Sequence, residues 1–235
     1  MKGLRELRQL AEAEGASFFG VADLAPAHEE IREQGGIAVA RFPRAISVGI
    51  RLLDAIVDQL PNRAEDAFVA MNYRYHAYDL VNERLDLITS RLSSALQDAG
   101  YEALPIAASQ TVDGERLLGA FSNKLAAHLA GLGWIGKSCL LVTPEAGPRV
   151  RWATILTDAP LEPTGEAMEE HCGDCQECVD VCPQGAFSGR PFRPEEPRAM
   201  RFDVHKCKTY FNELSEAGQV PVCGMCLYVC PHGRT

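Results

Sequence analysis

The spacing of apolar residues along the chain predicts a succession of helices and strands. Leu4, Leu7 and Leu10 fall on one face of a helix over residues 3–14, and Gly15 follows as a helix stop. A longer helical pattern fills residues 66–99. Short apolar runs bounded by polar residues and glycines are typical of strands, and they occupy residues 16–24, 44–52, 101–109, 139–143 and 149–158.

A further helix is predicted over residues 115–130, where apolar residues again recur at helical spacing. Asp113 precedes this segment and has the short acidic side chain of an N-cap. The helix leads directly into a glycine-rich segment, 131–138.

The glycine-rich segment GLGWIGKS has the letters of two phosphate-binding motifs, G-x-G-x-x-G and G-x-x-x-x-G-K-S. Both motifs need a strand before the glycines and a helix after them, because the free N–H groups of that helix bind the phosphate. Here the predicted order is reversed. The sequence therefore argues against a nucleotide site and predicts a helix C-cap and a loop with positive φ angles or a close backbone approach.

Composition and charge narrow the class of protein. The 235 residues are 46% apolar, enough for a substantial core, and the formal net charge of -9 disfavours a nucleic-acid partner. No apolar run is long enough to span a membrane, and the amino terminus MKGLRELRQL carries charges where a secretion signal is apolar. We therefore expect a cytoplasmic protein that has no membrane association.

Cysteine usage is the most informative feature of the sequence. Eight of the nine cysteines lie in the last 64 residues, a density that in a reducing compartment favours metal thiolates over disulfides. The first group reads C-x2-C-x2-C-x3-C-P from Cys172 to Pro183, which is the bacterial ferredoxin pattern for 4Fe-4S clusters. The second group, from Cys207 to Pro231, reads C-x15-C-x2-C-x3-C-P.

The two cysteine groups predict two 4Fe-4S clusters that share their ligands. In two-cluster ferredoxins the cysteine before proline binds the other cluster. We therefore expect the first cluster to be held by Cys172, Cys175, Cys178 and Cys230, and the second by Cys182, Cys207, Cys223 and Cys226. Zinc is the alternative, but two zinc sites would not explain a three-cysteine run followed by Cys-Pro twice. The ninth cysteine, Cys139, lies among apolar residues and is interpreted as a buried thiol rather than a ligand.

The segment HLAGLGWIGKSCLLVTPEAGPRVRWATILTDAPL and the cysteine pattern together resemble the corrinoid-dependent iron–sulfur reductases, which include epoxyqueuosine reductase and reductive dehalogenase. The likeness is close from residue 125 to 231 and looser in EGASFFGVADL and FPRAISVGIRL. It implies an α/β fold, with a nitroreductase-like domain of the cobalamin-reductase type at 1–165 and a bacterial ferredoxin-like module with two 4Fe-4S clusters at 166–235.

The resemblance also implies a function. An oxidoreductase of this family passes electrons through the two clusters to a base-off corrinoid such as cobalamin, here near Gly131, Gly133, Gly136 and Lys137. Lys137 could bind a corrin amide or cap the preceding helix. The electron donor would be a low-potential protein such as ferredoxin or flavodoxin, and the substrate a small molecule or a corrinoid.

The sequence departs from the family pattern in two ways, one of which bears on the substrate and the other on the proton donor. The chain stops at Thr235, where epoxyqueuosine reductases continue into a helical-repeat domain, so we expect a short form with its own substrate and do not expect tRNA. Asp113 resembles the family's acidic proton donor but lies about one helical turn too early, and the position in register is near Leu117. Asp113 is therefore a weak catalytic candidate. The alternative function is a non-catalytic electron-transfer protein that re-reduces a partner corrinoid protein.

Overall fold

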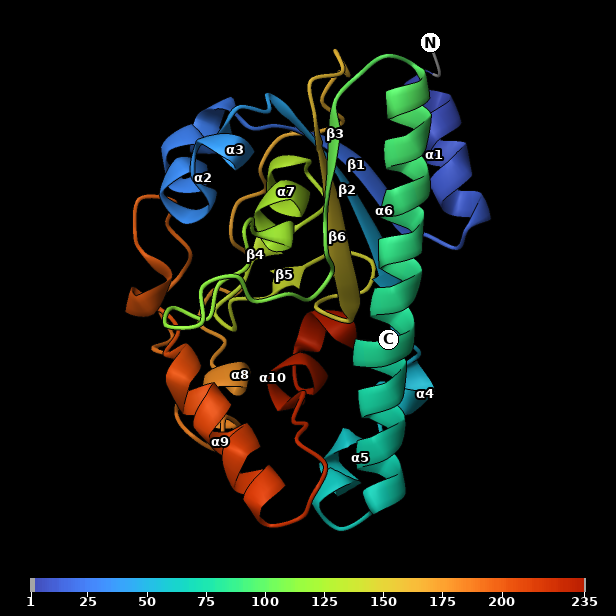
Figure 1. Ribbon diagram of the computed structural model, residues 1–235. Helices are drawn as coiled ribbons and strands as arrows, with labels where there is room; N and C mark the ends of the chain where they lie inside the picture. Colours follow the sequence, from blue (N-terminus) through green and yellow to red (C-terminus); the bar gives the residue numbers. More distant parts are fainter. Residues whose placement is uncertain (1–2, 235) are drawn as a thin grey trace. The chain divides into compact units, whose positions relative to one another are not determined.

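The computed structural model describes residues 3–234, which form two compact units (Figure 1). The first unit comprises Met1–Arg51, Val81–Gly133 and Arg151–Met168, and the second comprises Leu52–Leu80, Trp134–Val150 and Glu169–Thr235. These units differ from the predicted division into residues 1–165 and 166–235. The difference arises because two segments that precede residue 166, namely 52–80 and 134–150, pack with the cysteine-rich end.

A four-stranded sheet is the centre of the first unit, with strand order β1-β2-β6-β3. The antiparallel pairs are β1 with β2, where Val21 faces Ile46, and β3 with β6, where Pro105 faces Ile155. The strands are β1 (Phe18–Asp23), β2 (Arg44–Arg51), β3 (Ala103–Ile106) and β6 (Val150–Thr157). All four lie within the predicted apolar runs.

Helices cover the sheet of the first unit on both sides (Figure 1). On one side α1 packs against β1, and α6 packs against α1, β2 and β3, while α7 lies against β1 and β2 on the other side. The helices are α1 (Leu4–Ala13), α2 (His28–Gly35), α3 (Ile37–Ala40), α6 (Val81–Asp98) and α7 (Asn123–Leu129). The predicted stop of α1 is confirmed, since Gly15 has a φ of 92°.

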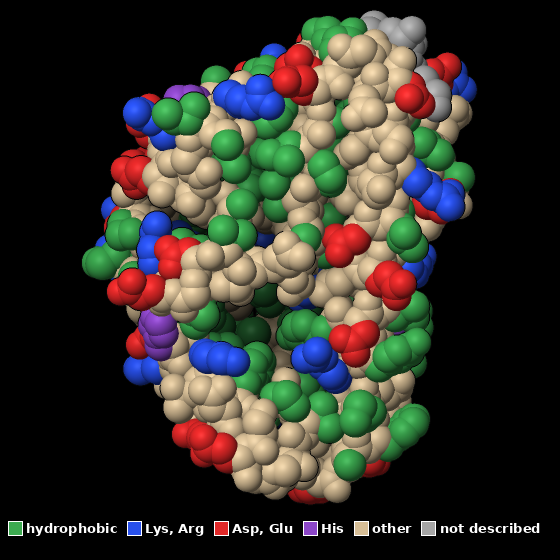
Figure 2. All heavy atoms as spheres, viewed as in Figure 1, with side chains coloured by type: hydrophobic (Ala, Val, Ile, Leu, Met, Phe, Trp, Pro, Cys, Tyr) green, Lys and Arg blue, Asp and Glu red, His purple; other side chains and the backbone are tan. Residues whose placement is uncertain are grey.

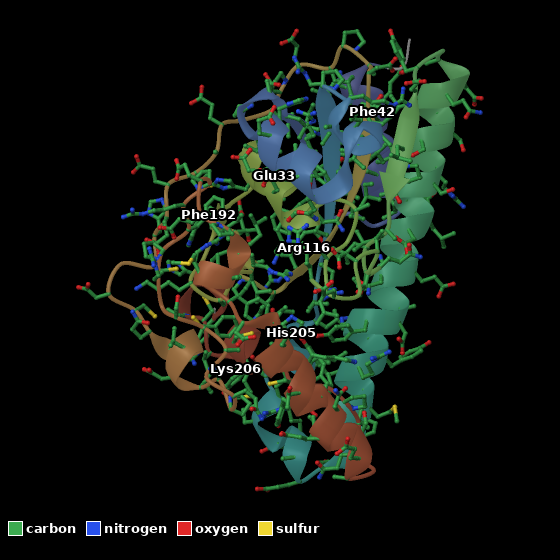
Figure 3. All side chains as sticks on the ribbon, turned by 60° about the vertical axis from the view of Figure 1, so that its left-hand side comes forward. Glu33, Phe42, Arg116, Phe192, His205 and Lys206 are labelled. Carbon is green, nitrogen blue, oxygen red and sulfur yellow. The ribbon has the colours of Figure 1, made fainter. Side chains whose placement is uncertain are left out.

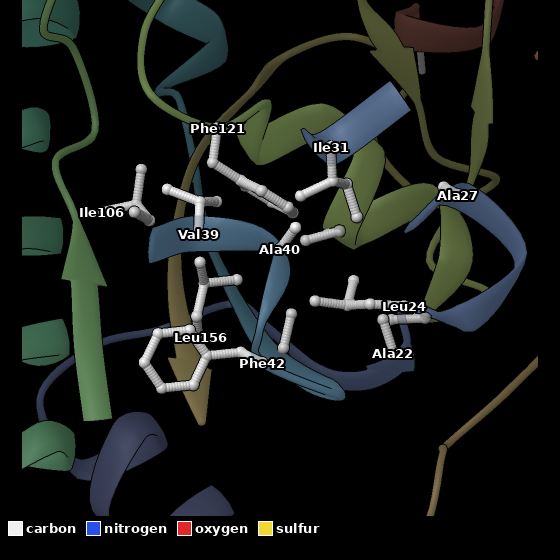
Figure 4. Close-up of a cluster of buried hydrophobic side chains, with 13 residues drawn as sticks. Ala22, Leu24, Ala27, Ile31, Val39, Ala40, Phe42, Ile106, Phe121 and Leu156 are labelled. Atoms are coloured by element: carbon white, nitrogen blue, oxygen red, sulfur yellow. The ribbon is translucent and has the colours of Figure 1, made fainter. Parts of the chain in front are cut away.

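The core beside α7 is built from small and branched side chains (Figure 4). Phe42 and Phe121 are its largest members, each 4% exposed, and Leu156 is fully buried among them. Ala126 and Ala130 of the α7 region join them, so that α7 can approach the sheet closely. This packing fixes the end of α7, from which the glycine-rich segment begins.

The predicted helix over residues 115–130 is wrong in its first half. Within residues 115–130 the structure has one helix, α7. Its N-cap is Ser122 rather than Asp113, and the Ser122 hydroxyl accepts from the N–H of Leu125. Residues 107–121 form a loop in which Asp113 bridges to Leu118, and Arg116 lies on this loop (Figure 3). The apolar residues of the loop reach the core without helical geometry, as Phe121 does.

The helical pattern over residues 66–99 is divided between the two units. It consists of α5 (Ala67–Arg74), a π-helix at Tyr75–Leu80 and then α6. α5 and the π-helix belong to the second unit and α6 to the first. Gly100 ends the run with a φ of 88°, as the sequence predicted.

The second unit consists of short elements joined by turns. Its helices besides α5 are α4 (Asp54–Val57), α8 (Glu177–Asp180), α9 (Val204–Glu216) and α10 (Met225–Tyr228), and its strands are β4 (Trp134–Ile135) and β5 (Leu141–Val142), which pair antiparallel. The glycine-rich segment therefore follows α7 and contains β4, in the predicted order of helix and then strand.

Charged side chains of both signs are interspersed on the face shown in Figure 2 and do not gather by sign there. Among the helices of residues 3–234, none is both long and apolar enough to cross a membrane.

Candidate functional site

Four cysteines from the two ends of the cysteine-rich segment surround one cavity of the second unit. Cys172, Cys175, Cys178 and Cys230 line it, together with Lys137, Ser138, Val142, Pro231 and His232. Cys230 comes from the second cysteine group, so the cavity joins the two groups as the ferredoxin pattern predicts. The same four residues are those expected to hold the first cluster.

Tight turns bring the first three of these cysteines together. The N–H of Cys175 donates to the carbonyl of Cys172 over 3.0 Å, and Gly173 between them has a φ of 50°. α8 then carries Cys178 one turn further along the chain. Glycine is favoured at position 173 because a side chain would strain this left-handed turn.

The thiols of this group interact through their charge. Burial raises the pKa of Cys178 to about 12, and repulsion from Cys172, Cys230 and Cys175 adds to this effect. Burial also raises the pKa of Cys230 to about 11. Four half-buried thiolates so close together need cationic charge between them, which the iron atoms of a cluster supply.

The other four cysteines form a second group in the same unit. Burial raises the pKa of Cys226, and repulsion from Cys223, Cys207, Cys178 and Cys182 raises it further. Burial, with repulsion from Cys223 and Cys182, raises the pKa of Cys207 to about 11. Since Cys178 of the first group acts on Cys226 of the second, the two groups are neighbours.

α9 places Cys207 at the second group. Asp203 caps this helix, its carboxylate accepting from the N–H of His205 at 3.1 Å and of Lys206 at 3.3 Å. His205 and Lys206 are labelled in Figure 3. The Lys206 ammonium donates to the carbonyl of Gly185 over 3.3 Å, which ties α9 to the turn that follows Cys182.

The first cysteine group surrounds a cavity rather than a site for a single metal ion. No three His, Cys, Asp or Glu side chains within residues 3–234 are close enough to share a single metal ion. Instead, four thiols surround a cavity in the first group. A buried N–H group also lies beside them: burial raises the pKa of Cys172, and the indole N–H of Trp134, which has no other partner in the described part of the chain, opposes part of that rise. Cluster sulfur is a suitable acceptor for such a donor.

The loop 134–138 serves the first cysteine group. The buried Lys137 ammonium donates to the carbonyls of Gly173 at 2.6 Å and Cys175 at 3.1 Å. A Cβ on Gly136 would lie 3.3 Å from the Cys172 sulfur and 3.0 Å from Val142. Lys137 thus neither caps α7 nor is left open to solvent, since it holds the backbone of the cysteine turn.

Gly131 and Gly133 lie in the first unit. Gly131 has a φ of 73°, and a Cβ there would approach the backbone of Glu166 to 2.9 Å. The carbonyl of Gly133 is 3.1 Å from Nδ1 of His128 on α7. The positive φ and close backbone approach expected of the segment are present at Gly131. Because these contacts are all with protein groups, corrinoid binding by Gly131, Gly133, Gly136 and Lys137 stays a prediction.

Asp113 and Cys139 have structural partners. The Asp113 carboxylate accepts from the N–H groups of Glu115 at 3.0 Å and Arg116 at 2.8 Å, so it closes a turn. Cys139 is 4% exposed, as expected of a buried thiol, and its sulfur is 4.0 Å from the Arg201 guanidinium. A catalytic role for Asp113 stays a prediction.

Sequence reasoning missed two side chains that reach the cysteines. Trp134 is 3% exposed, and its ring meets those of His171 and His232 edge to face at 5.0 and 4.9 Å. Arg63 lies 3.8 Å from the Cys223 sulfur. Trp134 lies within the conspicuous glycine-rich segment, but nothing in the pattern around Arg63 indicates a cysteine 160 residues away.

Four cysteines around one cavity are the ligand set of a 4Fe-4S cluster, and comparison with known families extends this to two clusters. Residues 171–233 match the 4Fe-4S double cluster binding domain. All eight predicted ligands lie within this segment.

Curated relatives extend the likeness to most of the chain. Epoxyqueuosine reductase of Pseudomonas aeruginosa is 30% identical over 237 residues, covering 93% of this chain and 59% of the relative. The Bacillus subtilis enzyme is 30% identical over 203 residues, covering 80% and 49%. The chain thus spans about half the length of these relatives.

Solved structures share the fold. A reductive dehalogenase whose structure suggests a mechanism for B12-dependent dehalogenation has a TM-score of 0.69 and 19% identity, covering 98% of this chain and 31% of the other. An epoxyqueuosine reductase bound to an epoxyqueuosine-modified tRNA-Tyr stem loop has a TM-score of 0.58 and 19% identity, covering 97% and 64%. The resemblance and the fold class predicted from the sequence are therefore confirmed: the chain is similar in sequence to epoxyqueuosine reductases, shares the fold of these solved structures and contains a double 4Fe-4S domain.

Proposed function

We propose that the protein is an iron–sulfur reductase that passes electrons one at a time through two 4Fe-4S clusters to a corrinoid or a similar flat cofactor. The observation that carries the proposal is the meeting of Cys230 with Cys172, Cys175 and Cys178 around one cavity. This arrangement supports two clusters that exchange ligand cysteines, as in electron-carrying ferredoxins. The double cluster binding domain supports the same conclusion.

The residues of the chain hold and insulate the clusters. The cysteine thiolates would bind iron, and Lys137 fixes the turn of Cys172 and Cys175 through its two carbonyl contacts. Trp134, buried beside Cys172, excludes water and presents an N–H to sulfur. Electrons would pass between the clusters because the two cysteine groups are neighbours, with Cys178 acting on Cys226.

The corrinoid is supported by the relatives. A cobalt corrinoid supplies a strongly reducing centre when it is bound, and a structural neighbour is described as B12-dependent. The segment 131–137 remains the proposed contact. Of its residues, Gly131 and Gly133 supply backbone groups, because Lys137 is engaged by the cysteine turn.

The substrate and the electron donor are further parts of the proposal. We retain a low-potential ferredoxin or flavodoxin as donor, since each transfers single electrons. For the substrate we propose a small molecule or a corrinoid. One relative was solved with a tRNA stem loop, so an epoxyqueuosine-containing RNA is the competing substrate to assay beside it.

A non-catalytic electron-transfer protein is the second candidate function. It is favoured by the position of Asp113, whose carboxylate is used in closing a turn and is not presented as a free acid. Such a protein would keep the clusters and deliver their electrons to a partner corrinoid protein.

Metal content and absorption spectra distinguish the two candidates. The full chain is purified without oxygen and reconstituted with iron and sulfide, and its iron and cobalt are measured with and without added cobalamin. We expect about eight irons and one retained cobalt per chain, from two four-iron clusters and one corrinoid. Eight irons with no retained cobalt and an unchanged corrinoid spectrum would favour the electron-transfer protein. Fewer than four irons would contradict both.

A further inference from the structure

One cationic side chain from outside the cysteine-rich segment reaches a thiol of the second group. Arg63 lies in a short 3-10 helix, η2 (Leu60–Ala64), more than 100 residues before the double cluster binding domain. Its guanidinium places one nitrogen 3.8 Å from the Cys223 sulfur and donates from another to the carbonyl of Leu60 over 3.2 Å.

The backbone around this contact is tightly packed. Leu60 is fully buried, and Pro61 stands in the first turn of η2. Gly224, directly after Cys223, has a φ of 77°, and a Cβ there would lie 2.8 Å from Leu60 and 2.9 Å from the Tyr73 hydroxyl. The cysteine turn therefore rests directly on η2 and α5, so the Arg63 guanidinium is held at the thiol by the fold.

The charge of Arg63 is available to the second cysteine group. Within the part of the chain that the structure describes, no carboxylate forms an ion pair with it, and its Nε is buried without a hydrogen-bond partner. Arginine stays protonated at all ordinary pH values. A cation beside a thiolate acts strongly in a partly buried site, because the low local dielectric weakens screening.

We propose that the charge of Arg63 raises the reduction potential of the second cluster, the one held by Cys182, Cys207, Cys223 and Cys226. The inference rests on the proposed cluster content. Reduction places one electron, taken from a low-potential one-electron donor, on the cluster core, and no bond is formed or broken. The added negative charge interacts favourably with the guanidinium, so the reduced state is stabilised more than the oxidised state. Arg63 would thereby make the second cluster the better electron acceptor.

A redox titration of the cluster-loaded full chain tests this inference. The chain is titrated with dithionite and mediators, and the two reduced clusters are followed by electron paramagnetic resonance. We expect Arg63→Gln to lower the reduction potential of the second cluster by about 59 mV, which corresponds to a tenfold change in the equilibrium constant of a one-electron reduction. The potential of the first cluster should be unchanged.

Two further variants separate the contact from general effects of charge and folding. Arg63→Lys keeps the cation and should leave the second cluster closer to the native potential than Arg63→Gln does. Arg74→Gln removes a charge from the neighbouring α5, where Arg74 pairs with Asp79 at 3.4 Å, and should shift neither cluster. If Arg63→Gln fails to retain the second cluster, comparison of Arg63→Lys with the native chain decides. The lysine side chain is shorter, so its charge lies farther from the Cys223 sulfur and the potential of the second cluster should still fall measurably.

The inference is overturned if the second cluster keeps its potential in both Arg63 variants, or if Arg74→Gln shifts it as far as Arg63→Gln. The proposed function fails differently: reconstituted native chain would then give no signals of two 4Fe-4S clusters at all.

Discussion

At the scale of single residues, Lys137 has the clearest structural contacts. The sequence predicted a corrinoid contact or a helix cap for it, and the structure places its buried ammonium between the carbonyls of Gly173 and Cys175. A charged hydrogen bond to a buried carbonyl contributes about 1.5–3 kcal/mol, so Lys137 is one of the main supports of the first cysteine turn.

Lys137→Met should therefore weaken the first cluster and spare the second. The variant removes both hydrogen bonds while keeping most of the length of the side chain, and we expect iron to fall from about eight to about four per chain because only the first four-iron site is lost. Iron quantification with electron paramagnetic resonance measures this. Cys139→Ala, which alters a buried thiol outside both groups, is the control and should keep all the iron. Unchanged iron with lost cobalt in Lys137→Met would instead support the corrinoid contact.

Gly224 offers a second test at the residue scale. Gly224 and Gly218 have similar φ angles, 77° and 71°, but a Cβ on Gly224 would meet Leu60 and Tyr73 whereas one on Gly218 would meet nothing within 4 Å. We expect Gly218→Ala to lower the free energy of unfolding by about 1 kcal/mol through backbone strain alone. Gly224→Ala should cost about 2–4 kcal/mol, because overpacking is added to the same strain. Urea unfolding of the cluster-loaded chain compares the two, and equal losses would contradict the packing of Cys223 on η2.

At the scale of elements, the sequence predicted the regular parts of the fold better than the connections. The strands of the first unit and α1 follow from local apolar patterns, and the structure has them. The helix over residues 115–130 was too long because Phe121 is buried from a loop, and a period of apolar residues does not tell a helix from a loop that folds back onto the core. The cysteine groups were predicted from spacing, but the contact of Arg63 depends on packing between distant segments, which spacing does not encode.

α7 also carries a pH-sensitive contact. His128 is buried, and this burial lowers its pKa, although the bond to the Gly133 carbonyl opposes the shift. The unfolded histidine takes up a proton near pH 6.5, while the folded one does so only at lower pH. The unfolded state thus binds more protons below about pH 6.5, and the stability contributed by neutral His128 is lost as the pH falls through this range.

Hydrogen exchange of the α7 amides should show this loss. We expect protection of α7 to decrease between about pH 7 and 5, after correction for intrinsic exchange, and to decrease less in His128→Asn, whose amide can still donate to Gly133 without titrating. His28→Asn, at a half-exposed histidine of the same unit, serves as the control. The same pH slope in His128→Asn and in the native chain would contradict the assignment.

At the scale of the whole molecule, the second unit depends on iron more than the first. Its helices other than α9 have at most eight residues, and eight of its thiols are gathered in two groups. The first unit has a four-stranded sheet with helices on both sides and its own buried core. The second unit of the metal-free chain should therefore stay folded but unfold more easily than the first, because cluster binding supplies part of its folding free energy.

The thiol pKa values turn this dependence into a prediction about pH. Burial raises the pKa of Cys172, Cys178, Cys207, Cys226 and Cys230, to about 12 for Cys178 and about 11 for Cys207 and Cys230. All five are thiols at neutral pH in the metal-free chain, so cluster assembly at pH 7 should release at least five protons per chain, measurable in a pH-stat.

Stability should follow the same titration. In the metal-free chain the unfolded thiols ionise near pH 9 while the folded ones stay protonated to about pH 11 or 12, so the free energy of unfolding should fall as the pH rises through this interval. In the loaded chain the thiolates are bound to iron and no longer titrate, so its urea midpoint should change less between pH 8 and 10.5. Parallel curves for the two forms would mean that the buried thiols do not hold the clusters, because iron binding would then have left their ionisation unchanged.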